Sequence, residues 1–168
     1  MMIQTTKDDY RIAGLAALAI SIHIAEAAFP SPIPGIKPGL ANIITIAALL
    51  RFGWSTALWI SLLRVFVGSI VLGTFLSPTF ILSLSGAISS ILILGLAQYL
   101  PGKGAGPVGY SILAALAHMA GQFTSAWLLF IPHPALFNLL PVLMSAALIF
   151  GIINGIIVSG MLGKRQKT

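Results

Sequence analysis

Apolar residues run through this chain in six long stretches, and only short polar or proline- and glycine-rich breaks separate them. A helix that crosses a bilayer needs roughly 20 consecutive apolar residues, and five of the six stretches reach about that length. We therefore predict an all-α membrane protein, a bundle of about six transmembrane helices at residues 11–29, 40–51, 54–76, 79–100, 108–131 and 135–162.

Composition supports this fold class. Only 7% of the 168 residues are charged and 58% are hydrophobic, whereas soluble domains carry about 25% charged residues. The apolar stretches leave no room for a soluble domain, so we predict a single integral membrane domain over residues 1–168.

The second stretch, residues 40–51, is too short for a straight span and follows the segment "PSPIPGIKPG", residues 30–39. Prolines block helix formation here, and glycines permit tight backbone geometry. Irregular backbone at membrane depth is tolerated only where protein buries it or where it lines a wet cavity. We predict an external loop over 30–39. Either part of it enters the membrane, or the second helix is short, tilted or partly buried in protein.

The basic residues predict the orientation of the chain. If it crosses the membrane six times from a cytoplasmic N-terminus, Lys37 lies outside and Arg64 lies within a span. The remaining Lys and Arg then share the cytoplasmic side, as the positive-inside rule requires. They are Lys7, Arg11, Arg51, Lys103, Lys164, Arg165 and Lys167. We predict cytoplasmic tails at 1–10 and 163–168, and we do not interpret the net charge of +6 as nucleic-acid binding.

Four polar side chains within the spans are candidates for a ligand site. Glu26 lies near the outer end of the first span, and Arg64 lies about ten residues into the third. His118 lies at a similar depth in the fifth span, with Gln122 one turn further out on the same helix face. Charged groups in the membrane are costly, by about 2.5–3.5 kcal/mol on insertion scales, and usually mark function. The alternatives are a structural Glu26–Arg64 ion pair and an interhelical hydrogen bond from His118 and Gln122.

Lys37 and Asn42 extend this candidate site toward the outer mouth. The predicted helix start at 40–42 carries a partial positive charge that favours anions, and Lys37 precedes it. For Lys37 the alternative is an interfacial lysine whose ammonium reaches the head groups. We interpret His23 as a packing or interfacial residue and His133, in "PHP", as a solvated loop residue.

Small residues recur every four positions on two of the predicted helices. Ala13, Ala17 and Ser21 form one such row, and Gly151 and Gly155 form another. Rows of this kind let helix backbones approach closely. Each row predicts either packing inside the bundle or a docking face for another membrane subunit.

No catalytic pattern appears in the chain. It has no cysteine, and its only carboxylates are Asp8, Asp9 and Glu26. Metal-dependent phosphoryl chemistry needs clustered carboxylates, and no P-loop, HExxH or nucleophile-elbow motif is present. We therefore predict a binder or conduit, not an enzyme, with no metal and no cofactor.

Four sequence blocks resemble a bacterial membrane family: "PGIKPGLANIITIAALL", "SLLRVFVGSIVLGT", "SLSGAISS" and "SILAALAHMAGQ". The family is known both as the Gx transporter family and as heptaprenyl diphosphate synthase component I. The resemblance covers about residues 26–160. Its most specific parts are K-x-G-L-A-N and H-x-x-G-Q, in which Pro38 stands where the family more often has leucine and Met119 where it has asparagine.

This family in turn resembles the substrate-binding S-components of energy-coupling factor (ECF) importers. That resemblance implies a multi-pass protein of the bacterial cytoplasmic membrane that captures a small molecule near the outer face. Its implied partners are a membrane coupling subunit and ATPase subunits. S-components typically dock through an alanine-rich A-x-x-x-A face on the first helix, which Ala13 and Ala17 match.

Two functions therefore stay open after the sequence. In the first, Lys37, Asn42, Arg64, His118 and Gln122 bind a small polar or anionic solute, with Glu26 neutralising Arg64. In the alternative, the chain is a non-catalytic membrane component associated with heptaprenyl diphosphate synthase and isoprenoid metabolism. The synthases that extend prenyl chains use aspartate-rich motifs, which this chain lacks, so it is not the catalytic subunit.

Overall fold

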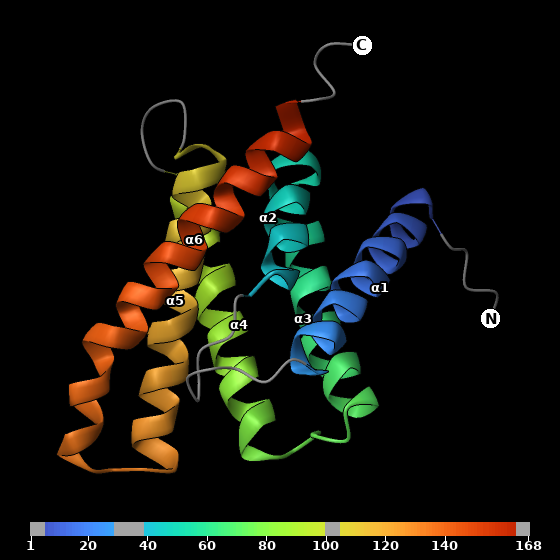
Figure 1. Cartoon of the computed structure of the whole chain (residues 1–168). Helices are drawn as coiled ribbons and strands as arrows, with labels where there is room; N and C mark the ends of the chain where they lie inside the picture. Colours follow the sequence, from blue (N-terminus) through green and yellow to red (C-terminus); the bar gives the residue numbers. More distant parts are fainter. Residues whose placement is uncertain (1–5, 29–38, 100–104, 164–168) are drawn as a thin grey trace.

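The computed structural model describes residues 6–28, 39–99 and 105–163, and every regular element in these ranges is helical (Figure 1). Five helical segments are long and apolar enough to cross a membrane, and a sixth helix, α2, is shorter. The predicted all-α, multi-helix membrane bundle is confirmed. Its elements are α1 (Lys7–Ala28), α2 (Ala41–Phe52), α3 (Trp54–Val71), α4 (Pro78–Ala97), α5 (Gly106–Leu129), the 3-10 helix η1 (Pro134–Leu139) and α6 (Leu140–Gly163).

The helices form one continuous packed bundle. The most extensive contacts join α5 to both α4 and α6, and α1 packs mainly on α3 (Figure 1). The largest core cluster joins α2, α4, α5 and α6 through large apolar side chains such as Ile46, Leu94 and Val158, none of which is exposed. This cluster packs α3, α4, α5 and α6 around α2.

The short helix α2 lies inside the bundle. Eight of its residues are buried: Ala41, Asn42, Ile43, Ile44, Thr45, Ile46, Ala48 and Leu49. Its twelve residues extend about 18 Å at 1.5 Å per residue, less than the ~30 Å hydrocarbon core. Because neighbouring helices cover it on most sides, α2 does not need to reach both membrane surfaces. Of the two explanations for its length, burial in protein is the one that the structure shows.

Two predicted helix boundaries were wrong by several residues. α1 begins at Lys7, within the predicted tail 1–10, because Thr6 and Asp9 form a capping box. The Asp9 carboxylate accepts from the Thr6 amide at 2.7 Å, and the Thr6 hydroxyl accepts from the Asp9 amide at 3.3 Å. α3 ends at Val71, and Gly73 and Leu76 then adopt positive φ. The last span agrees with its predicted bounds within one residue and opens with the 3-10 helix η1, which begins at Pro134.

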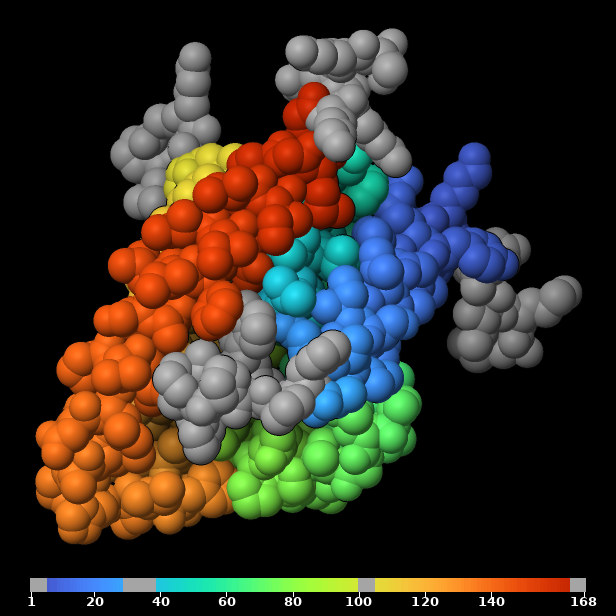
Figure 2. Space-filling model, in the orientation of Figure 1, coloured from blue at the N-terminus to red at the C-terminus, as the bar shows by residue number. Residues whose placement is uncertain are grey.

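The two rows of small residues have different roles. Gly151 and Gly155 pack on α5, where a Cβ would lie 3.0 Å from the Ile112 Cα and 2.5 Å from the Val108 Cα, respectively. The second row, Ala13, Ala17 and Ser21, lies on an exposed face of α1. In Figure 2, α1 lies at the surface of the bundle. Internal packing therefore explains the row on α6 and does not explain the row on α1.

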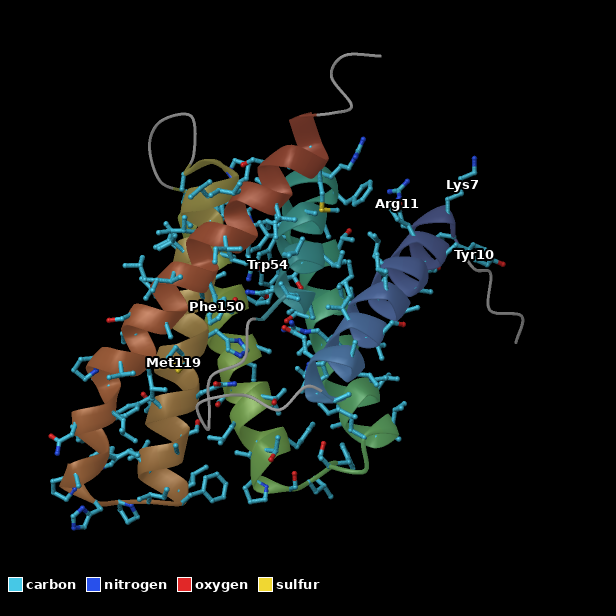
Figure 3. The ribbon with its side chains drawn as sticks, viewed as in Figure 1. Lys7, Tyr10, Arg11, Trp54, Met119 and Phe150 are labelled. Atoms are coloured by element: carbon cyan, nitrogen blue, oxygen red, sulfur yellow. The ribbon has the colours of Figure 1, made fainter. Side chains whose placement is uncertain are left out.

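The basic residues of the described helices gather at one end of the bundle, Arg64 excepted. Lys7 and Arg11 lie near the start of α1 (Figure 3). The Arg11 guanidinium carbon lies 4.5 Å from the Phe52 ring centroid. That contact brings the start of α1 beside the end of α2, where Arg51 lies in the last turn. The shared end agrees with the predicted orientation, which stays a prediction. Lys37, Lys103, Lys164, Arg165 and Lys167 lie outside the described residues.

Candidate functional site

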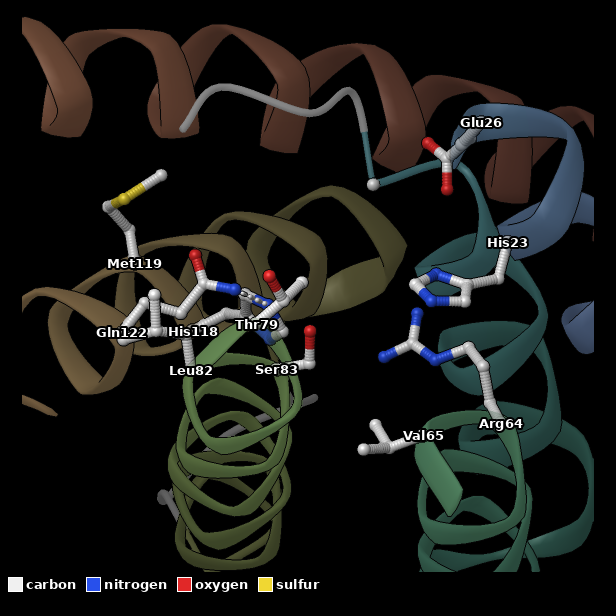
Figure 4. A pocket seen from close by; sticks show the side chains of 11 residues that line it. His23, Glu26, Arg64, Val65, Thr79, Leu82, Ser83, His118, Met119 and Gln122 are labelled. Atoms are coloured by element: carbon white, nitrogen blue, oxygen red, sulfur yellow. Dashed lines mark hydrogen bonds between the residues drawn. The ribbon is translucent and has the colours of Figure 1, made fainter. Parts of the chain in front are cut away.

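A cavity of about 360 Å³ opens among α1, α3, α4 and α5, beside Gly39, which lies two residues before α2 (Figure 4). Polar side chains from four different helices line it, and three apolar side chains complete its wall. The lining residues are His23, Glu26, Gly39, Arg64, Val65, Thr79, Leu82, Ser83, His118, Met119 and Gln122. Its volume is in the ~300–1,000 Å³ range of small-molecule pockets.

Arg64 supplies positive charge to this cavity. α3 presents the side chain, which is 6% exposed, and its Nε has no hydrogen-bond partner. Across residues 6–28, 39–99 and 105–163, the one ion pair within 4.0 Å joins Arg11 to Asp8 at the surface. A guanidinium stays protonated in proteins. The cavity therefore contains a buried cation with no carboxylate in contact.

The Glu26–Arg64 ion pair, one of the two alternatives left open by the sequence, is not formed within 4.0 Å. The Glu26 carboxylate instead accepts hydrogen bonds from the backbone amides of Leu40, at 2.6 Å, and Ala41, at 3.4 Å. Amides in the first turn of a helix have no intrahelical acceptor and carry partial positive charge, so they attract a carboxylate. The helix start that the sequence predicts as an anion site therefore binds a carboxylate of the chain itself.

His118 and Gln122 form a hydrogen-bonded pair on α5. Their Nε2 atoms are 3.0 Å apart, so the amide of Gln122 donates and the unprotonated Nε2 of His118 accepts. This bond runs along one helix and is not the interhelical bond considered from the sequence. Gly86 on α4 makes space for the pair, since a Cβ there would lie 2.8 Å from His118 Nε2 and 2.9 Å from Gln122 Cγ.

The remaining wall contains hydroxyl and apolar side chains. Ser83 lies between the Arg64 guanidinium and the His118–Gln122 pair, and Thr79 lies one turn nearer the start of α4 (Figure 4). Val65 and Met119 add apolar surface on either side. Among the residues that the structure describes, no group of three or more His, Asp or Glu side chains is placed to hold a metal ion.

The structure brings four of the six predicted binding residues together: Glu26, Arg64, His118 and Gln122. Asn42 is buried in α2, 8% exposed, and does not line the cavity, although its Oδ1 has no partner. Lys37 lies outside the described residues. The role of all six residues in binding stays a prediction.

Sequence reasoning missed His23, Gly39 and Asn154. His23 lines the cavity, with its Cδ2 3.0 Å from where a Gly68 Cβ would lie. Its spacing of three residues from Glu26 is the signal that places both on one helix face. Gly39 has φ +67°, and its carbonyl accepts from Asn154 Nδ2 at 3.3 Å. Asn154 is the lone amide side chain within α6, which is itself a signal in an apolar span.

Taken together, the helices and the cavity define a multi-pass α-helical membrane protein with a polar site inside the bundle. A family model described as heptaprenyl diphosphate synthase component I matches residues 15–161, and the chain belongs to this family. The family resemblance seen in the sequence is thereby confirmed. Neither the curated proteins nor the solved structures gave a match to the chain.

Proposed function

We propose that this protein is a non-catalytic membrane subunit that binds a small anionic solute in the cavity beside Arg64. The observation that carries the proposal is the buried guanidinium, which faces the cavity and has no carboxylate in contact. A charge inside a bilayer is costly unless something compensates it. A bound anion in the adjoining cavity compensates it.

Two biological settings suit such a subunit. Family membership supports a component that works with a heptaprenyl diphosphate synthase. The other setting is an importer of the ECF type, in which the subunit captures its solute from outside the cell. The cavity, which lies toward the end of the bundle away from Arg11 and Arg51, supports capture from outside under the predicted orientation. The family match favours the first setting.

The two settings predict different partners. In the first, the partner is the soluble catalytic subunit of the synthase. In the second, a membrane coupling subunit packs on the exposed row of Ala13, Ala17 and Ser21 and is driven by ATPase subunits. A mild-detergent pull-down of the tagged protein from its host, analysed by mass spectrometry, separates them. Recovery of a prenyl synthase establishes the first setting, and recovery of ATPases with a membrane subunit establishes the second.

Replacing Arg64 tests the binding function in either setting. We expect Arg64→Met to abolish anion binding, because the substitution keeps the apolar stem and removes the charge. Arg64→Lys is the control, since it keeps a positive charge without the planar fork and should retain weakened binding. The measurement is mass spectrometry of small molecules that the purified proteins release on denaturation. An anion should appear from the wild type and not from Arg64→Met.

Folding of the Arg64→Met variant is checked by size-exclusion chromatography and thermal unfolding. Burying an uncompensated charge costs energy, so its removal should leave the fold intact or more stable. A variant that unfolds would assign Arg64 to holding helices together. A wild type that releases no anion would contradict the binding function itself.

A further inference from the structure

We infer that the ligand is a small monoanion with an uncharged hydrogen-bonding group at its other end, and that Gln122, held by His118, selects for that group. This inference rests on the proposed binding function and names the class of ligand. It depends on three features of the cavity: its charge balance, its size and the unused hydrogen-bonding capacity opposite Arg64.

The cavity offers a ligand one full positive charge, that of Arg64. Arg64 is the one Lys or Arg that lines it within the described ranges. Glu26 is the one carboxylate there, and its hydrogen-bond donors are two backbone amides at the start of α2, not Arg64. A diphosphate brings more than one negative charge, and sites that hold phosphates combine several cationic or N–H donors. With its helix start occupied by Glu26, this cavity offers an anion one cationic side chain among the described residues, Arg64.

The size of the cavity corresponds to a small metabolite. Its volume of about 360 Å³ equals about a dozen water molecules, at ~30 Å³ for each in the liquid. That volume encloses a compact acid and is too small to enclose a long polyprenyl chain. The cavity volume therefore favours a small solute over an isoprenoid product as the ligand.

The far side of the cavity offers hydrogen bonds and no formal charge. One amide N–H of Gln122 donates to His118, which fixes the amide and leaves Gln122 Oε1 without a hydrogen bond among the described residues. Figure 4 shows this amide on the side of the cavity opposite Arg64, with the Ser83 hydroxyl between them. A site built from buried hydrogen-bonding groups rejects analogues that lack the matching group, because its own polar atoms are then left unpaired. Gln122 is thus placed to determine specificity.

Simple acids test this inference on the full chain in lipid nanodiscs. N-Acetylglycine has a carboxylate and a neutral amide, whereas pentanoate has the carboxylate and a chain of similar length without the amide. Inorganic pyrophosphate represents the multiply charged alternative. Dissociation constants are measured by isothermal titration for the wild type, Gln122→Leu and a control, Gln98→Leu. Gln98 is an exposed glutamine that follows α4, outside the cavity.

We expect the wild type to bind N-acetylglycine at least about tenfold more tightly than pentanoate. This ratio should fall to about one in Gln122→Leu and stay unchanged in Gln98→Leu. Equal affinities of the wild type for the two acids, or tighter binding of pyrophosphate, would overturn the inference and leave the anion-binding function standing. Absence of binding by all three anions would overturn both.

Discussion

At the scale of single residues, Glu26 is the side chain whose environment decides its role. Its carboxylate joins α1 to the start of α2 through the amides of Leu40 and Ala41. We expect Glu26→Gln to lower the free energy of unfolding by about 1 kcal/mol, since a neutral amide accepts these hydrogen bonds more weakly than a carboxylate. Equilibrium unfolding in mixed micelles measures the change.

The matched control for Glu26 is Asp8→Asn, which removes a surface carboxylate from the same helix. Exposed ion pairs contribute little, so this variant should unfold like the wild type. If Glu26→Gln were as stable as the wild type but lost anion binding, the carboxylate would act on the ligand or on Arg64, and the cap would not be its main role.

The site was predictable from sequence where a polar residue is rare in its span. Arg64 and the pair His118 and Gln122 stand out from apolar surroundings, and helical spacing alone puts the pair on one face. The hydrogen-bond partner of each polar side chain was not predictable from the sequence. Glu26 contacts backbone amides that any sequence would supply, and such amides leave no mark in the pattern of side chains. For the same reason the sequence did not indicate that the Gly39 carbonyl pairs with Asn154.

At the scale of helices, the two rows of small residues respond differently to added volume. Gly155→Ala places a Cβ 2.5 Å from the Val108 backbone, so α5 and α6 must separate. We expect a loss of about 1–3 kcal/mol in the free energy of unfolding, which is typical of overpacked cores.

Ala17→Leu adds volume to an exposed face of α1 and should leave stability unchanged while it prevents capture of a membrane partner.

Unfolding in micelles and the pull-down are the two measurements for these variants. If Ala17→Leu retained every partner that the wild type captures, the row on α1 would not be a docking face. If Gly155→Ala were as stable as the wild type, the close approach of α5 and α6 would not limit packing.

Helix number and type were predictable because the apolar runs are long and the breaks contain proline and glycine. The burial of α2 was left open, since a twelve-residue apolar run fits a tilted span as well as an interior helix. Only the packing of α1, α3, α5 and α6 around it distinguishes the two. A predicted helix boundary was wrong where a local hydrogen-bonding motif extends the helix. The capping box of Thr6 and Asp9 extends α1 into the predicted tail in this way.

At the scale of the whole molecule, the orientation of the bundle decides which compartment supplies the ligand. The chain contains no cysteine, so single-cysteine variants report on one position each. Asn138→Cys places a thiol in η1, and Gln98→Cys places one just after α4, at the end where Trp54 of α3 bonds to the Ile91 carbonyl. The shared end of Arg11 and Arg51 predicts that Gln98 faces the cytoplasm.

We therefore expect a membrane-impermeant maleimide to label Asn138→Cys in intact cells and Gln98→Cys only after permeabilisation. This result would show that the cavity lies toward the outside. Thr79, which lines it, is in the first turn of α4, at the end opposite Gln98. An importer subunit requires that side. The reverse labelling would place the cavity on the cytoplasmic side, where a soluble prenyl synthase works, and would contradict the capture of an external solute by Arg64.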